Sequence, residues 1–156
     1  MHQNIDLIEL LRALNDEAAE YLIIGGYAFA FHGRPRATKD IDIFIGCDPA
    51  NAHRVWRALA AFGAPLAELT EADLASPATF FIMGRPPNQI DIITSIDGVV
   101  FGDAWMNRIE STYAGVRVCY IGKADLIANK KAAGRYQDLA DVAYLEERES
   151  ERPTDS

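Results

Sequence analysis

Residues 40–46, with the sequence DIDIFIG, alternate acidic and aliphatic side chains, and this constrains the fold more than any other feature of the chain. A period of two predicts a β-strand, because side chains two residues apart on a strand point to the same side. Asp40 and Asp42 then share one face and the aliphatic residues share the other. Two neighbouring carboxylates repel each other unless water or a cation neutralises them. The strand therefore either has an ordinary solvated face or holds a hard cation such as Mg²⁺ or Mn²⁺.

A pair of glycines, Gly25 and Gly26, separates the two elements that precede this strand. The apolar run Tyr21–Ile24 predicts a short buried strand, and residues 27–32 predict a short helix. Glycine allows the backbone to approach a phosphate closely, and the free N–H groups in the first turn of a helix point towards an anion. The glycines therefore indicate a phosphate site, and a tight turn without a ligand is the alternative.

A third acid, Asp91, interrupts an otherwise aliphatic run at residues 89–94. This run and residues 79–83 flank the turn sequence GRPPN, so we predict a β-hairpin. A carboxylate buried in such a strand is costly without a partner. If the strand lies beside residues 40–46, three carboxylates meet, and such a set can hold two divalent ions for phosphoryl or nucleotidyl transfer. An acid on an edge strand that faces water is the alternative.

The remaining pattern mixes helices and strands without regular alternation, which predicts an α+β (mixed α/β) fold, a core sheet flanked by helices. The expected helices are residues 4–18, 49–62, 101–108, 125–134 and 137–147; the further strands are residues 109–113 and 116–121; and residues 63–77 are a loop with at most one helical turn. We expect a single domain over residues 1–147 with a small helical part at 122–147. A charged, frayed tail is expected at residues 148–156.

Composition limits the classes of protein and partner. Hydrophobic residues make up 49% of the 156 residues, which is typical of a globular protein. The formal net charge of -8 argues against non-specific DNA binding, because such binding needs a basic surface. The sequence has no apolar stretch of about 18 residues and no signal-peptide pattern, so we expect no membrane partner. Two cysteines without metal-ligand spacing suit a reducing cytoplasm.

Two segments together resemble a known superfamily. GGYAFAFHGRPRATKDIDIFI, residues 25–45, resembles the core motif of the nucleotidyltransferases that include polymerase beta-like enzymes, and more narrowly looks like bacterial nucleotidyltransferases related to AbiEii-type toxins. LIANKKAAGRYQDLADVAYL, residues 126–145, is similar to their second motif, in which a lysine precedes an arginine and an Asp-x-x-Asp. Many minimal members have Gly-Ser and a shorter gap before Asp-x-Asp, whereas residues 27–39 form a longer gap here.

The resemblance implies a role for each residue of the first motif and for Asp91. Asp40, Asp42 and Asp91 would bind Mg²⁺ or Mn²⁺. Asp91 would also help to deprotonate the acceptor hydroxyl. Gly25 and Gly26 would cradle the triphosphate of an NTP substrate.

The second motif has two interpretations. The resemblance implies that Lys130 contacts the nucleotide phosphates during catalysis and that Asp138 completes the pocket. Alternatively, Lys130 lies on a solvated helix face. Arg135, Asp138 and Asp141 are spaced three residues apart, so they can also form a structural set of ion pairs.

The loop before the acidic strand is basic. Arg34, Arg36 and Lys39 add positive charge there and could bind triphosphate oxygens. Thr38 could order the turn into the strand. A loop that is simply soluble is the alternative.

The expected function is transfer of a nucleoside monophosphate from an NTP to an acceptor hydroxyl on a tRNA, a protein or a small molecule. The resemblance to AbiEii-type toxins implies a role as the toxin of a toxin–antitoxin pair, with a cognate antitoxin as partner. One alternative is a nucleotidyltransferase that modifies small antibiotics, since those enzymes share the core. Another is a catalytically inactive, nucleotide-binding or antitoxin-like module.

Overall fold

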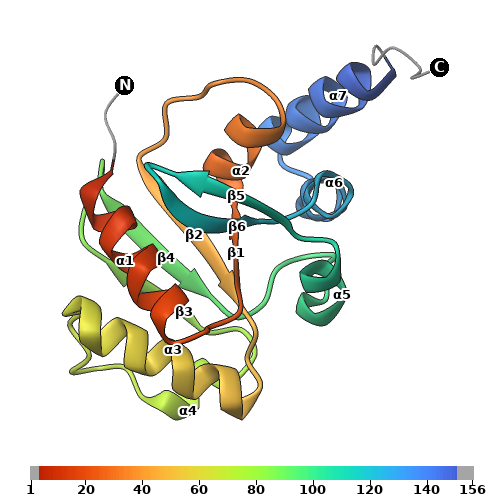
Figure 1. Ribbon diagram of the computed structural model, residues 1–156. Helices are drawn as coiled ribbons and strands as arrows, with labels where there is room; N and C mark the ends of the chain where they lie inside the picture. Colours follow the sequence, from red (N-terminus) through yellow and green to blue (C-terminus); the bar gives the residue numbers. More distant parts are fainter. Residues whose placement is uncertain (1–3, 151–156) are drawn as a thin grey trace.

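A six-stranded mixed sheet with helices on both faces forms the protein, as the computed structural model of residues 4–150 shows (Figure 1). The strands are Tyr21–Ile24 (β1), Asp40–Ile45 (β2), Phe80–Met83 (β3), Gln89–Ile93 (β4), Ile109–Tyr113 (β5) and Val116–Tyr120 (β6), in the order β3-β4-β2-β1-β6-β5. β2 runs parallel to β4 and antiparallel to β1, and β1 runs parallel to β6. The predicted α+β class is confirmed.

The helices are divided between the two faces of the sheet. They are Ile5–Asp16 (α1), Gly25–His32 (α2), Pro49–Phe62 (α3), Glu71–Leu74 (α4), Phe101–Met106 (α5), Lys123–Ala133 (α6) and Tyr136–Ser150 (α7). In Figure 1, α1, α3 and α4 lie on one side of the sheet, and α2, α6 and α7 lie on the other. Within residues 4–150, none of these helices combines the length and the apolar character that a membrane crossing requires.

The alternation in β2 fixes the direction of its acids. Ile41, Ile43 and Ile45 are at most 1% exposed and belong to the hydrophobic core, together with the leucines on the inner face of α1. Side chains alternate along a strand, so burying this aliphatic face directs Asp40 and Asp42 to the opposite face. The hydrophobic effect on one side of β2 therefore positions the charged groups on the other.

Local capping signals set several helix boundaries. Asp48 accepts a hydrogen bond from the Asn51 backbone N–H at 3.0 Å, and α3 ends where Gly63 takes a left-handed conformation. The predicted bounds of α3 are thereby confirmed. The predicted helix at residues 4–18 is too long, because α1 ends at Asp16 and Ala18 adopts a φ of 54°.

The C-terminal helices also differ from their predicted bounds. Gly134 ends α6 in a left-handed conformation, one residue earlier than predicted. α7 begins at Tyr136 and continues to Ser150, so Arg148 is helical where the sequence predicted a frayed tail. Residues 151–156 of that predicted tail lie outside the described residues.

Candidate active site

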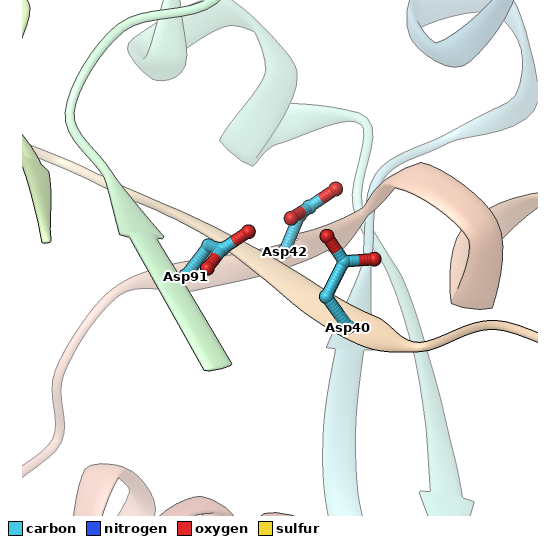
Figure 2. A group of neighbouring side chains, drawn as sticks. All are labelled: Asp40, Asp42 and Asp91. Carbon is cyan, nitrogen blue, oxygen red and sulfur yellow. The ribbon is translucent and has the colours of Figure 1, made fainter. Parts of the chain in front are cut away.

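Three carboxylates meet on one face of the sheet (Figure 2). Asp40 and Asp42 occupy alternate positions on β2, and Asp91 lies on β4, the parallel neighbour of β2. The register pairs Asp42 directly with Asp91, so the two side chains point to the same side. One oxygen from each of the three carboxylates lies within 4.8 Å of the other two. The strands are thus neighbours, as the three-carboxylate hypothesis requires.

The electrostatics of this cluster favour a cation. Burial, the hydrogen bond with Asp91 and the charge of Asp40 together raise the pKa of Asp42 to about 7, with burial as the largest cause. Burial and Asp91 also raise the pKa of Asp40. Asp91 is 3% exposed, and its Oδ1 accepts a hydrogen bond from Gln89 Nε2 at 2.8 Å. Three hard oxygen donors that repel one another match the ligands that Mg²⁺ or Mn²⁺ prefers, so the residues fit such an ion.

Gly25 allows the backbone to lie against this cluster. It has a φ of +65°, and α2 begins here instead of at residue 27 as predicted, because glycine can start the helix from a left-handed conformation. A Cβ at this position would collide with the Asp42 carboxylate. A Cβ on Gly26 would press against Thr38, whose Oγ1 donates to the Asp40 carbonyl oxygen at 2.7 Å. Both glycines therefore bring the start of α2 close to β2.

We expect Gly25→Ala to lower the free energy of unfolding and to weaken divalent cation binding. The left-handed backbone costs an alanine about 1 kcal/mol, and the new methyl group displaces the Asp42 carboxylate. Gly115→Ala is the matched control, because Gly115 has a φ of +80° and no atom of the described part of the chain lies within 4 Å of an added Cβ. Denaturation should show a loss of stability in both variants, and Mn²⁺ titration should show weaker binding only in Gly25→Ala. Equal Mn²⁺ affinities would contradict this account of Gly25.

The carboxylates form the floor of a cleft of about 550 Å³. Gly25 also lines this cleft, and the corner between α6 and α7 forms a wall of it with Lys130, Arg135 and Asp138. Phe80, Asp97 and Asn129 also line it, and the sequence did not single out any of these three. Phe80 comes from the edge strand β3, and only the pairing of β3 with β4 brings it beside the acids.

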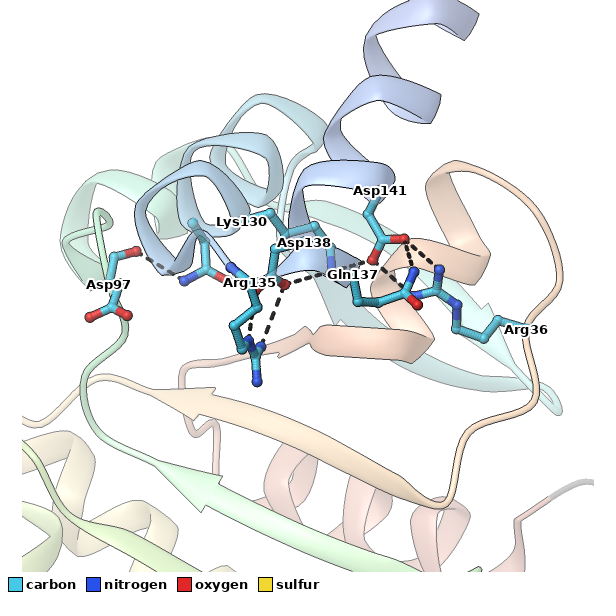
Figure 3. Close-up of polar contacts among 8 residues, drawn as sticks. Arg36, Asp97, Lys130, Arg135, Gln137, Asp138 and Asp141 are labelled. Carbon is cyan, nitrogen blue, oxygen red and sulfur yellow. Dashed lines mark hydrogen bonds and ion pairs between the residues drawn. The ribbon is translucent and has the colours of Figure 1, made fainter.

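Lys130 is part of a buried ion-pair network in the cleft wall (Figure 3). Its side chain is 8% exposed, and its Nζ lies 2.8 Å from Asp141 Oδ2 and 3.6 Å from Asp138 Oδ1. Asp141 also accepts a hydrogen bond from Arg36 Nη1 at 2.9 Å, and Arg135 Nε donates to Asp138 Oδ2 at 2.7 Å. The structural ion-pair set expected as the alternative for the second motif is therefore present, with Lys130 and Arg36 as additional members.

The basic loop before β2 does not line the cleft. Arg36 is bound to Asp141 and lies over the Phe29 ring, 3.9 Å from its centroid. Neither Arg36 nor Lys39 is among the residues that line the cleft, and the same holds for Gly26 and Thr38. The structure thus does not bring the predicted phosphate contacts of this loop to the carboxylates. Thr38 orders the entry into β2 through its hydrogen bond to the Asp40 carbonyl oxygen, in agreement with the role in the turn that the sequence suggested.

Asp42→Asn is expected to stabilise the metal-free protein by about 1–3 kcal/mol at pH 8, because it removes a half-buried charge that lies beside two others. The raised pKa of Asp42 means that its ionisation destabilises the fold increasingly as pH rises from about 4 to 7. Thermal unfolding in EDTA measures the gain, and Mg²⁺ should then stabilise the wild type but not the variant. Asp103→Asn, which changes an exposed acid in α5, is the control and should alter neither value. If Asp42→Asn is less stable than the wild type in EDTA, the ionised Asp42 carboxylate does not destabilise the fold as predicted.

Two solved structures resemble this chain in fold. A candidate nucleotidyltransferase from Thermotoga maritima (TM1012) is 18% identical with a TM-score of 0.57, and the match covers 94% of this chain and 91% of that one. The lincosamide antibiotic adenylyltransferase LnuA, solved with lincomycin bound, is 17% identical with a TM-score of 0.56, and the match covers 90% of this chain and 94% of that one. At these identities the likeness shows a shared fold.

Sequence comparison gives the family. No curated protein matches the sequence. The profile of the family described as "Nucleotidyltransferase of unknown function (DUF6036)" matches residues 2–146, which includes both motifs and all three carboxylates. The chain therefore belongs to this nucleotidyltransferase family.

Proposed function

We propose that the protein is a Mg²⁺- or Mn²⁺-dependent nucleotidyltransferase that moves a nucleoside monophosphate from an NTP to an acceptor hydroxyl. The observation that carries this proposal is the set of three carboxylates, within 4.8 Å of one another, on the floor of a cleft. Membership of a nucleotidyltransferase family supports the same reaction. An inactive nucleotide-binding module is less well supported, because clustered carboxylates are costly without a cation.

The residues of the cleft suit each part of this reaction. Asp40, Asp42 and Asp91 would hold the divalent ion, which when bound neutralises phosphate oxygens and favours attack at the α-phosphorus. The N–H groups in the first turn of α2, which begins at Gly25, offer hydrogen bonds to the phosphates. Asp91 would accept the proton of the acceptor hydroxyl while the oxygen bonds to the α-phosphorus. The bond from that phosphorus to the bridging oxygen breaks, and pyrophosphate leaves.

A small hydroxylated molecule is the acceptor that the charges favour. Among residues 4–150, five acids line the cleft, against two basic side chains, and the protein as a whole has a net charge of -8. A phosphate-rich RNA would meet repulsion at such a surface. The shared fold with LnuA, which is named as a lincosamide antibiotic adenylyltransferase, supports a small acceptor as well. Transfer to tRNA or protein, and the role of a cytoplasmic toxin with an antitoxin partner, rest on the sequence resemblance alone.

The test follows a label placed on either the α-phosphate or the γ-phosphate of the NTP. Protein and Mg²⁺ are incubated with α-labelled or γ-labelled ATP, GTP, CTP or UTP, and with total tRNA, the protein itself, or lincosamide and aminoglycoside antibiotics. We expect the α-label on an acceptor, the γ-label in pyrophosphate, and neither transfer in EDTA. If the γ-label appears on the acceptor, the reaction is phosphoryl transfer and the proposed nucleotidyl transfer is wrong.

A further inference from the structure

The wall of the cleft that the α6–α7 corner forms carries its positive charge. Among residues 4–150, Lys130 and Arg135 are the basic side chains that line the cleft, and both come from the α6–α7 corner. An NTP bound at the carboxylate floor carries most of its negative charge on the β- and γ-phosphates. A positive group of the protein has to neutralise this charge. The two basic residues differ sharply in whether they can do so.

Lys130 is held in place by ion pairs within the protein. Its side chain is 8% exposed and its ammonium group lies between the carboxylates of Asp141 and Asp138, at 2.8 Å and 3.6 Å. Moving it towards a ligand would leave Asp141, whose side chain is 2% exposed, with a buried charge and one cation fewer. Lys130 therefore stabilises the α6–α7 corner. Its positive charge acts on a ligand in the cleft mainly through its electrostatic field and not by direct contact.

Arg135 is placed to bind a ligand. Its side chain is 79% exposed, and Figure 3 shows it extending from the corner towards the sheet. Nε and Nη2 donate to Asp138 at 2.7 Å and 3.4 Å, and the Nη1 group donates no hydrogen bond within residues 4–150. The hydrogen bond that Arg135 donates to Asp138 raises the pKa of Arg135, and the charge of Asp42 on the cleft floor adds to this rise. The guanidinium thus lies in the field of the carboxylate floor and keeps a free donor group.

The ion pair between Arg135 and Asp138 can be exchanged at little cost. A pair with one largely exposed partner contributes little to stability. Asp138 also has two other partners, the Arg135 backbone N–H at 3.3 Å and Lys130 Nζ at 3.6 Å. It is therefore not left unpaired if the guanidinium turns away. A phosphate can accept two parallel N–H bonds from a guanidinium just as a carboxylate does.

We propose that Arg135 binds the β- and γ-phosphates of the NTP by exchanging its Asp138 carboxylate for phosphate oxygens. This inference rests on the proposed nucleotidyltransferase function and assigns the polyphosphate contact to Arg135 in place of Lys130, Arg36 or Lys39. Asp138 then serves as the resting partner of Arg135 and as a cap for the start of α7.

Calorimetric titration with magnesium tripolyphosphate tests the contact without any dependence on the nucleobase. We expect Arg135→Gln to weaken binding about 10- to 100-fold, the effect of losing a charged hydrogen-bonding partner, and Arg135→Lys to recover part of it. Lys131→Gln is the matched control, because Lys131 is the next lysine on α6 and its exposed side chain pairs with Glu146 at 2.7 Å, outside the cleft lining. It should change the affinity less than twofold.

The outcomes separate this inference from the proposed function. If the wild type binds magnesium tripolyphosphate and Arg135→Gln binds it equally well, the inference fails and the proposed function stands. If Arg135→Gln lowers the unfolding temperature and leaves the affinity unchanged, Arg135 has only a structural role at the start of α7, and the inference again fails. If the wild type binds neither magnesium tripolyphosphate nor any magnesium NTP, both fail.

Discussion

Asp91→Asn is expected to lower the rate of nucleotidyl transfer by about 10³-fold or more, because a general base contributes roughly 10²–10⁴-fold and the variant also loses one charged ligand for the ion. The substitution keeps the shape of the side chain, and an asparagine Oδ1 can still accept the hydrogen bond that Gln89 donates. Asp91 is 3% exposed, so its carboxylate acts only on groups within the cleft. The loss should appear in kcat, measured with α-labelled NTP.

The binding of the NTP separates the role of Asp91 from a general loss of the site. Asp40 and Asp42 stay in place on β2 in this variant, so we expect the NTP affinity to fall by less than about tenfold. Asp103→Asn, in the exposed first turn of α5, is the control for removal of an acid and should keep full activity. Retention of more than a tenth of the wild-type kcat by Asp91→Asn would show that Asp91 is not the proton acceptor.

Asp141→Asn is expected to lower the free energy of unfolding by about 3–5 kcal/mol at pH 7, the cost of breaking a buried ion pair by removing one partner. Asp141 is 2% exposed and is the shared partner of Lys130 on α6 and Arg36 in the loop before β2. The variant leaves two cations near a neutral amide. Urea denaturation followed by circular dichroism measures the change.

The pH dependence of this loss identifies its cause. Burial alone would raise the pKa of Asp141, but hydrogen bonds from Arg36 and Lys130 hold it well below its usual range. A depressed pKa contributes stability above the unfolded value, near pH 4, and that contribution disappears as pH falls through the folded value. The gap between wild type and Asp141→Asn should therefore narrow below about pH 4.

Glu146→Gln provides the control on the same helix. It breaks the exposed pair between Glu146 and Lys131, and such pairs contribute at most about 1 kcal/mol. An equally small effect of Asp141→Asn would mean that the buried network does not hold the loop and the α6–α7 corner together.

Much of the floor of the cleft could be predicted from the sequence, because it follows from short-range patterns. The period of two in residues 40–46 predicted a strand with both acids on one face, and residues 89–94 predicted a second strand that contains one acid. The sequence left open whether these two strands are neighbours. The structure shows that they are, and their register depends on the packing of the whole core.

The wall of the cleft could not be predicted in the same way. Arg36 and Asp141 are 105 residues apart, so the spacing of charges on α7 could suggest an ion-pair set but not its partner in the basic loop. The resemblance implied that Lys130 contacts the nucleotide phosphates, because it is the charged lysine of the second motif. Burial between two carboxylates, which decides its chemistry, depends on how α6 packs against α7. Gly25 was recognised as a phosphate signal, whereas its steric need beside Asp42 is visible only in three dimensions.

Calorimetric titration of ATP, GTP, CTP and UTP into the wild type and Asp42→Asn, each in Mg²⁺ and in EDTA, tests the central claim most directly. It asks whether the three carboxylates bind an NTP through a divalent ion, and it needs no knowledge of the acceptor. We predict that at least one NTP binds the wild type in Mg²⁺, and that binding weakens at least about tenfold both in EDTA and in Asp42→Asn. Absence of binding of all four NTPs to the wild type in Mg²⁺, or equal binding under all conditions, would contradict the account.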